Sequence, residues 1–345
     1  MTSKEKVYTA LGFKEPSRVP RYVWYSGGAI KNLEVYTGLN GDALEDFLGN
    51  DIKQTWVSIN REMERDVPDG TEFTDEWGIT WKREEPHNMV IRHPLKGASV
   101  EELAEYPFPD PENPVRFSVL EDIIRKYGNE YFIGADVSGS IWEPSYHLAG
   151  MDDLLMSLGL EDRRAETLFD RTARFTLMVA RKALERNTDW IWLGDDVGTQ
   201  TGMLMSPEMW RKHLKPRLAH IIRELKSFRK NCIIAYHSCG SIPQIIEDLV
   251  EIGVNVLNPI QPKAAGMDIY KIKTEYSGVL ALMGNIDTQE FLKTASPGAV
   301  REETRRMAEE LGRGGGYIFA ASHSIQPDVP PENIVAMVET LNGSL

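Results

Sequence analysis

The chain has 345 residues, and 39 Lys and Arg against 52 Asp and Glu give it a formal net charge of −13. This acidity argues against non-specific binding to nucleic acid or to an anionic membrane surface, because both need a basic patch. Two cysteines, Cys232 and Cys239, are too few for a disulfide framework and fit a reducing compartment. The sequence also lacks a signal peptide and a membrane-spanning apolar run. We therefore expect a cytoplasmic protein.

Short apolar runs typical of buried strands alternate with segments of helical periodicity along most of the chain. Before the first run, residues 1–18 are expected to form an N-terminal helical extension. The runs that we interpret as strands are residues 19–25, 51–59, 131–135, 190–194, 232–236, 254–257, 279–283 and 317–321. Residues 71–95 differ, because the alternation around Trp77-Gly78 predicts a β-hairpin insertion.

Helix boundaries are marked by capping residues and prolines. Ser206-Pro207 and Ser296-Pro297 each supply an N-cap and a first-turn proline. Pro216 lies inside a helical pattern and is expected to kink or divide that helix. Pro331 is expected to begin the last helix.

A strand followed by a helix, repeated about eight times, predicts an α/β fold with a parallel sheet. Both a doubly wound sheet and a closed barrel satisfy this pattern. We favour a (β/α)8 TIM barrel, because polar residues follow many strands rather than one switch point. The whole chain, residues 1–345, is expected to be a single domain of this kind.

Polar side chains that follow the predicted strands would converge at the C-terminal mouth of such a barrel. They are Asp136, Asp195, Asp196, His237, Cys239, Asn258, Gln261, Asn285, Asp287 and His323. The N-terminal ends of the strands offer no comparable set. This asymmetry predicts an active site at the mouth.

The pair His237 and Cys239 is the most specific of these features. Side chains alternate along a strand, so both residues should point into the barrel mouth. An imidazole and a thiolate so placed can bind one zinc ion, and His323 from the last strand end could supply a third ligand. The alternative is that Cys239 is a small buried thiol and that both histidines make structural hydrogen bonds.

Each of the remaining candidate residues also has a purely structural explanation. At most one of Asp195 and Asp196 can face the mouth, as a ligand or base, and the other could cap a helix or form an ion pair. Aromatic and apolar side chains after strand ends could line a substrate pocket or could pack in the core. They are Trp24, Tyr25, Trp142, Tyr146 and Met203. Four further histidines, on the insertion or on expected helix surfaces, show no partner pattern: His87, His93, His213 and His220.

The chain resembles the uroporphyrinogen decarboxylase superfamily, which includes zinc- and corrinoid-dependent methyltransferases. The segments that carry the resemblance are SYHLAG at 145–150, GDDVGTQTGMLMSPEMW at 194–210, HSCGSI at 237–242, GVNVLNPIQ at 253–261, GNIDTQEFL at 284–292 and GGGYIFAASHSIQPDVPPENI at 314–334. The resemblance implies a (β/α)8 barrel and places Tyr146 where the family has a pocket tyrosine.

Two departures indicate the branch of the superfamily. The decarboxylases carry an arginine-rich loop after the first strand that holds substrate carboxylates, whereas residues 24–28 here (WYSGG) contain no arginine. The methyltransferase branch binds zinc through H-x-C and a later cysteine. His237 and Cys239 match the first two ligands, and His323 replaces the third.

The resemblance therefore implies a zinc-dependent methyltransferase that moves a methyl group between a small molecule or thiol and a corrinoid (cobalamin) protein partner. Asp196 is expected to be a fourth ligand or a proton acceptor, and Tyr146 a catalytic residue. The expected pocket consists of Trp24, Asp136, Trp142, Met203, Asn258 and Asn285. Two alternatives remain, a uroporphyrinogen decarboxylase-like lyase and a non-catalytic ligand-binding barrel. Barrels of this family often associate as homodimers.

Overall fold

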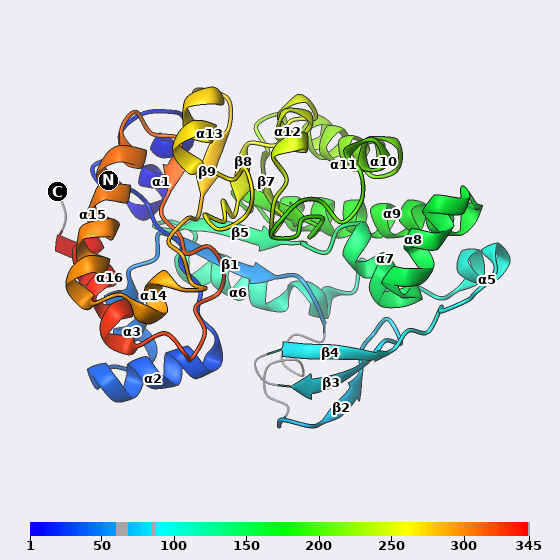
Figure 1. Ribbon diagram of the computed structural model, residues 1–345, viewed down its shortest axis with the longest axis horizontal. Coiled ribbons are helices and arrows are strands. Elements are labelled where there is room, and N and C mark those ends of the chain that lie inside the picture. The colour runs from blue at the N-terminus through cyan, green and yellow to red at the C-terminus, as the bar shows by residue number, and fades with distance from the viewer. Residues whose placement is uncertain (60–67, 85–86, 344–345) are drawn as a thin grey trace.

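The computed structural model describes residues 1–59, 68–84 and 87–343. Within them, seven parallel strands form one curled sheet in the order β1-β5-β6-β7-β8-β9-β10 (Figure 1). The strands are β1 (Ile52–Trp56), β5 (Phe132–Asp136), β6 (Trp190–Gly194), β7 (Ile233–His237), β8 (Val256–Asn258), β9 (Ala281–Met283) and β10 (Tyr317–Ile318). Each pairs in parallel with its neighbour in this order.

The segment 19–25 lies between the two edge strands of this sheet and takes the place of an eighth strand. On one side, the Tyr22 amide donates to the carbonyl oxygen of Phe319. On the other side, the Asp51 amide donates to the carbonyl oxygen of Arg21. Backbone hydrogen bonds therefore close the sheet, and the (β/α)8 barrel predicted from the sequence is confirmed.

Alternating strand residues fill the barrel interior. On β7, Ile233 and Ala235 contact the interior cluster, whereas Ile234 and Tyr236 belong to the core between the sheet and the helices. This is the alternation that places His237 toward the mouth. The N-terminal helix α1 (Ser3–Leu11) contributes Val7 to the same interior cluster.

The helices surround the barrel (Figure 1). Besides α1 they are α2 (Gly27–Thr37), α3 (Gly41–Leu48), α5 (Val100–Glu105), α6 (Ser118–Tyr127), α7 (Trp142–Ala149), α8 (Met151–Leu160), α9 (Arg163–Glu185), α10 (Pro207–His213), α11 (Lys215–Phe228), α12 (Ile246–Glu251), α13 (Ile269–Glu275), α14 (Phe291–Thr294), α15 (Pro297–Gly312) and α16 (Pro331–Gly343). Short 3-10 turns cover Pro114–Phe117 and Pro243–Ile245. Among the described residues, none of the helices combines the length and apolarity needed to cross a bilayer.

The local signals in the sequence set several of these boundaries. The Ser206 and Ser296 hydroxyls accept hydrogen bonds from the first turns of α10 and α15. The helix around Pro216 is divided, because α10 ends at His213 and α11 begins at Lys215. His213 itself, expected on a helix surface, is buried and contacts Glu166 of α9.

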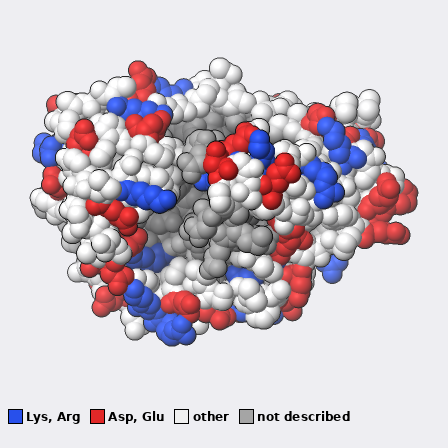
Figure 2. All heavy atoms as spheres, turned by 90° about the horizontal axis from the view of Figure 1, so that it is seen from below, with Lys and Arg blue, Asp and Glu red and all other residues white. Residues whose placement is uncertain are grey.

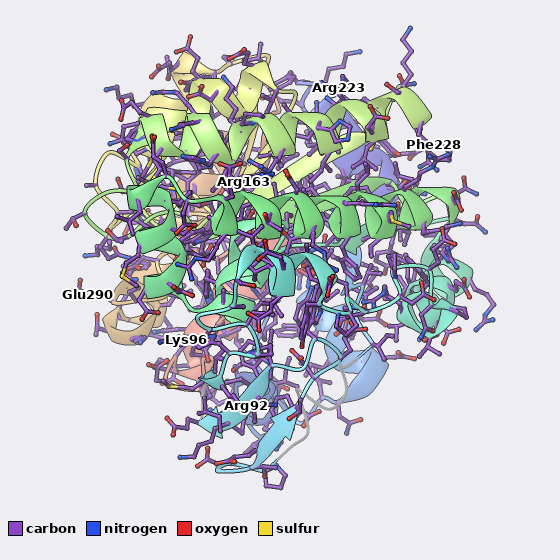
Figure 3. The ribbon with its side chains drawn as sticks, turned by 90° about the vertical axis from the view of Figure 1, so that its right-hand side faces the viewer. Arg92, Lys96, Arg163, Arg223, Phe228 and Glu290 are labelled. Atoms are coloured by element: carbon purple, nitrogen blue, oxygen red, sulfur yellow. The ribbon has the colours of Figure 1, made fainter. Side chains whose placement is uncertain are left out.

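The expected hairpin within 71–95 is present and has a third strand. The antiparallel strands β2 (Glu72–Thr74), β3 (Thr80–Glu84) and β4 (His87–Arg92) form a separate small sheet that projects below the barrel in Figure 1. Asp75 holds its first turn, because its carboxylate accepts hydrogen bonds from the Trp77 and Ile79 amides and from the Trp81 indole. Figure 3 shows the insertion, with Arg92 on β4, beneath the long helix α9.

Candidate active site

Asp196, His237 and Cys239 come together where β6 and β7 end. The Cys239 sulfur lies 3.5 Å from His237 Nε2, and Asp196 Oδ1 lies 3.6 Å from the same nitrogen. One possible ligand atom from each of the three residues lies within 4.8 Å of the others. The sequence placed all three at the barrel mouth.

The second ring nitrogen of His237 is oriented by Asn258 on the neighbouring strand β8. Asn258 Oδ1 lies 2.7 Å from His237 Nδ1, while the Asn258 amide nitrogen donates to the Met283 carbonyl oxygen. The amide oxygen of Asn258 therefore faces the ring, so that Nδ1 is the donor and Nε2 keeps its lone pair toward Cys239. This is how metal-binding histidines are held in proteins. Asn258, expected in the pocket, thus orients the candidate ligand His237.

Two glycines allow the loops that carry Asp196 and Cys239 to touch. A Cβ atom on Gly198 would lie 2.6 Å from the Cys239 carbonyl oxygen, and one on Gly240 would lie 2.5 Å from the Gly198 backbone. Gly240 also has a φ of +84°, which disfavours any residue with a side chain. This contact lets the Cys239 amide donate to Asp196 Oδ1 at 2.7 Å.

His323, the expected third ligand, is exposed and does not belong to the group formed by Asp196, His237 and Cys239. Its loop is nevertheless tied to the site. The Gln261 side chain accepts from the Gly240 amide at 2.8 Å and donates to the Ser322 carbonyl oxygen at 3.5 Å. The chain thus passes close to the site one residue before His323.

The donor set fits a zinc ion. Zn–N and Zn–S bonds of about 2.0 and 2.3 Å in tetrahedral geometry put the two ligand atoms about 3.5 Å apart, close to the separation of His237 Nε2 and Cys239 Sγ. Burial and the Asp196 carboxylate raise the pKa of the Cys239 thiol. Its thiolate form therefore calls for a cation beside it, which a divalent metal supplies.

Three further carboxyl groups surround Asp196. Asp195 is buried and accepts hydrogen bonds from the Ile141 and Glu143 amides at the start of α7, and burial raises its pKa to about 7. Burial, together with Asp196 and Asp195, raises the pKa of Glu143 well above its usual range. Burial also raises the pKa of Asp136, which accepts from Gln54 and Ser138. Of the adjacent pair, Asp196 faces the metal-ligand group and Asp195 caps a helix.

The remaining predicted pocket residues lie in several environments. Trp24 joins the barrel interior, where it packs edge-on against Trp192, whose ring stacks on His237. Trp142, the first residue of α7, is fully buried in the core. Tyr146 is half-buried, and burial, followed by the nearby Glu143, raises its pKa. Met203 pairs with Gly198 in the loop after β6.

Asn285 lies apart from these residues. It is buried at the end of β9 and lines a cavity of about 690 Å³, together with Asp287, beside α13 and α14. No hydrogen bond recorded for the described residues joins it to Asp196, His237 or Cys239.

Neither Glu143 nor the cavity beside the insertion was predicted from the sequence. Glu143 lines a cavity of about 230 Å³ between the insertion and the ends of β1 and β5. Its carboxyl is also hydrogen-bonded to the backbone of Asp196. The only local signal was an acidic residue directly before Pro144, near the start of a helix that follows a strand.

Comparison with known proteins identifies the family. Residues 75–343 match the family described as uroporphyrinogen decarboxylase (URO-D). Curated relatives include uroporphyrinogen decarboxylases of Legionella pneumophila (28% identical over 142 residues, 41% of this chain and 38% of the relative) and Thermus thermophilus (29% over 140 residues, 40% and 37%). The matched region thus spans well under half the length of these relatives.

Among solved structures, a methyltransferase from Methanosarcina mazei is similar over 99% of this chain and 98% of its own, with a TM-score of 0.74 and 18% identity. At this identity the likeness concerns the fold. The family match covers most of the chain, from the insertion through the last helix. The chain therefore belongs to the uroporphyrinogen decarboxylase (URO-D) family.

Proposed function

We propose that this protein is a zinc-dependent methyltransferase that exchanges a methyl group between a small molecule and a corrinoid protein. The observation that carries the proposal is the group of Asp196, His237 and Cys239, with Asn258 orienting the imidazole. A zinc ion bound there would polarise the oxygen, nitrogen or sulfur atom that carries or receives the methyl group. The corrinoid partner follows from the branch of the family that the H-x-C motif resembles.

Each side chain has a distinct task in this proposal. His237 and Cys239 bind the metal, and Asp196 takes the third position that the sequence assigned to His323. Three protein ligands leave a coordination position open for substrate. Tyr146 is near the carboxyl groups of Glu143, Asp195 and Asp196, so it would donate a hydrogen bond at the rim of the site.

The metal content of the purified protein tests whether these residues bind zinc. Purified protein should contain about one zinc per chain, and Cys239→Ser should lose it. Asp196→Asn should bind zinc more weakly than wild type in chelator competition, whereas His323→Ala should stay close to wild type. A protein without stoichiometric zinc, or a Cys239→Ser variant that keeps it, would refute the site. A large loss of affinity in His323→Ala would restore His323 as a ligand.

An activity assay tests methyl transfer, with free methylcobalamin in place of the corrinoid protein. Methyl transfer to a thiol acceptor, followed by the change in cobalamin absorbance, should depend on the zinc and fall to background in Cys239→Ser. Equal turnover in the zinc-free and zinc-loaded proteins would contradict the proposal.

Decarboxylation of a porphyrinogen is the second candidate, because the curated relatives carry that name. The arginines near the first strand argue against it. Arg18 forms an ion pair with the buried Asp51, and the Arg21 guanidinium bonds to Gly49 and Asn342. Both are thus committed to structural contacts rather than free to hold substrate carboxylates. Loss of carboxyl groups from uroporphyrinogen on incubation with the zinc-free protein would favour this candidate.

A further inference from the structure

The cavity beneath the insertion has walls rich in aromatic side chains. Its volume is about 230 Å³, and it is bounded by the ends of β1 and β5, by α7 and α9, and by the first turn of the insertion. The aromatic rings on its walls are Trp56, Trp77, Trp81, His147 and Phe175. An apolar cavity of about 150 Å³ is sufficient to hold benzene. The space therefore suits one substituted ring and is too small for a tetrapyrrole.

The charged groups in these walls already have partners. Arg116 is buried and makes two hydrogen bonds to the Glu76 carboxylate, at 2.8 and 2.7 Å. Asp75 accepts three hydrogen bonds within its own turn. Among the uncharged polar groups, the Thr176 hydroxyl also has a partner, because it donates to the Ser140 carbonyl oxygen. A charged ligand would therefore find no free counter-charge among these groups.

The electrostatics of the cavity disfavour ions of either sign. The Arg116 guanidinium already lies over the Phe175 ring, 5.2 Å from its centroid, so a second cation would meet a like charge. Arg116 is the only Lys or Arg among the described residues that line the cavity, and both of its hydrogen bonds to Glu76 are already made. An anion would therefore find no free cationic partner there. A neutral ligand avoids both costs.

Glu143 connects the cavity with the proposed metal site. Its side chain lines the cavity, and its carboxyl is hydrogen-bonded to the backbone of Asp196. The cavity and the candidate metal site thus adjoin each other at Glu143, so a substituent directed past Glu143 would approach Asp196.

We propose that this cavity binds the substrate as a neutral compound with a single aromatic ring, whose oxygen substituent is directed past Glu143 toward Asp196, His237 and Cys239. This inference rests on the proposed function, because the methyl group to be exchanged would be on that oxygen. The insertion then acts as the substrate-binding element of the barrel.

Three probes of similar shape and different charge test the proposal by calorimetry on the wild-type protein: methoxybenzene, 4-methoxybenzoate and phenyltrimethylammonium. Methoxybenzene should bind at least about tenfold more tightly than either ion, because an ion loses hydration without gaining a partner. Equal or tighter binding of an ion, or no binding of methoxybenzene, would overturn the proposal.

A matched pair of variants locates the binding site. Trp56 lines the cavity but is 42% exposed, so Trp56→Ala should leave folding intact and weaken methoxybenzene binding by about three- to tenfold. Phe228, 44% exposed at the end of α11, lies across α9 from the insertion (Figure 3), so Phe228→Ala should bind like wild type. Unchanged binding in Trp56→Ala would place the ring elsewhere and refute the assignment.

Cys239→Ser separates this inference from the function on which it rests. The variant should lose zinc and still bind methoxybenzene within about twofold of wild type, because the cavity walls do not include Cys239. Ring binding by a protein that never takes up zinc would keep the cavity assignment and remove the proposed function. Zinc uptake without ring binding would do the reverse.

Discussion

His147 should make the protein sensitive to acid in a predictable range. Its ring lies on α7 with its centroid 4.4 Å from the ring of Tyr146 and 5.0 Å from that of Trp81. Burial, with a smaller contribution from His93, lowers the pKa of His147 from 6.5 to about 4. The unfolded chain therefore takes up a proton at a higher pH than the folded protein does. The stability that the neutral, buried His147 contributes is therefore fully present above pH 6.5, and it is lost as the pH is lowered toward 4.

The size of this effect follows from the shift. A difference of one pKa unit corresponds to about 1.4 kcal/mol, so lowering the pH from 7.5 to 5 should cost about 2 kcal/mol through this one histidine. His147→Phe keeps an aromatic ring and removes the titration. The free energy of unfolding of this variant, minus that of wild type, should therefore rise by about 2 kcal/mol over the same range.

Urea denaturation of both proteins at several pH values measures this difference, in which the contributions of groups that do not interact with His147 cancel. His220→Phe is the control, because the His220 side chain is 52% exposed and loses little of its hydration on folding. A difference between His147→Phe and wild type that does not change with pH would show that the folded protein protonates His147 freely, and the reasoning from burial would be wrong.

Three further substitutions test the supports of the fold and the site. Asp51→Ala should lower the free energy of unfolding by about 1.5–3 kcal/mol in thermal or urea melts, because the buried carboxylate accepts hydrogen bonds from the partly exposed Lys6 and Arg18. Asp42→Ala at an exposed pair should change it by less than about 1 kcal/mol. Gly198→Ala should weaken zinc binding in chelator competition, because its Cβ would push apart the loops that carry Asp196 and Cys239. Gly202→Ala is the control and should bind zinc like wild type, because the space around Gly202 is open. Asn258→Ala should weaken zinc binding by about 10- to 100-fold through loss of the hydrogen bond that orients the metal-binding histidine, and an unchanged affinity would exclude that role.

The local pattern predicted the strands that are buried on both faces better than the closure of the barrel. Residues 190–194 form β6 as expected, because a run buried on both faces is apolar throughout. The expected strand at 317–321 shortens to Tyr317–Ile318, and residues 19–25 pair through isolated bridges. Their pairing depends on hydrogen bonds to distant segments, which leave no periodic signal in the sequence.

The residues of the candidate site were likewise predictable only where a local pattern fixed their position. His237 and Cys239 were predictable together because a period of two puts them on one face of one strand. Glu143 was not, because it reaches the site only through the capping of its helix by Asp195, from another strand end. The exposure of His323 was also invisible in the sequence, since it depends on the path of the loop after β10.

The donor set that the structure assembles has a consequence for the charge of the site. With Asp196 and Cys239 as anionic ligands and His237 neutral, a zinc ion is balanced to zero net charge, whereas His237, Cys239 and His323 would leave one positive charge. A half-buried centre costs less when it is neutral. Under the proposed function, a balanced metal centre beside a cavity whose charged wall residues are already paired would favour an uncharged substrate.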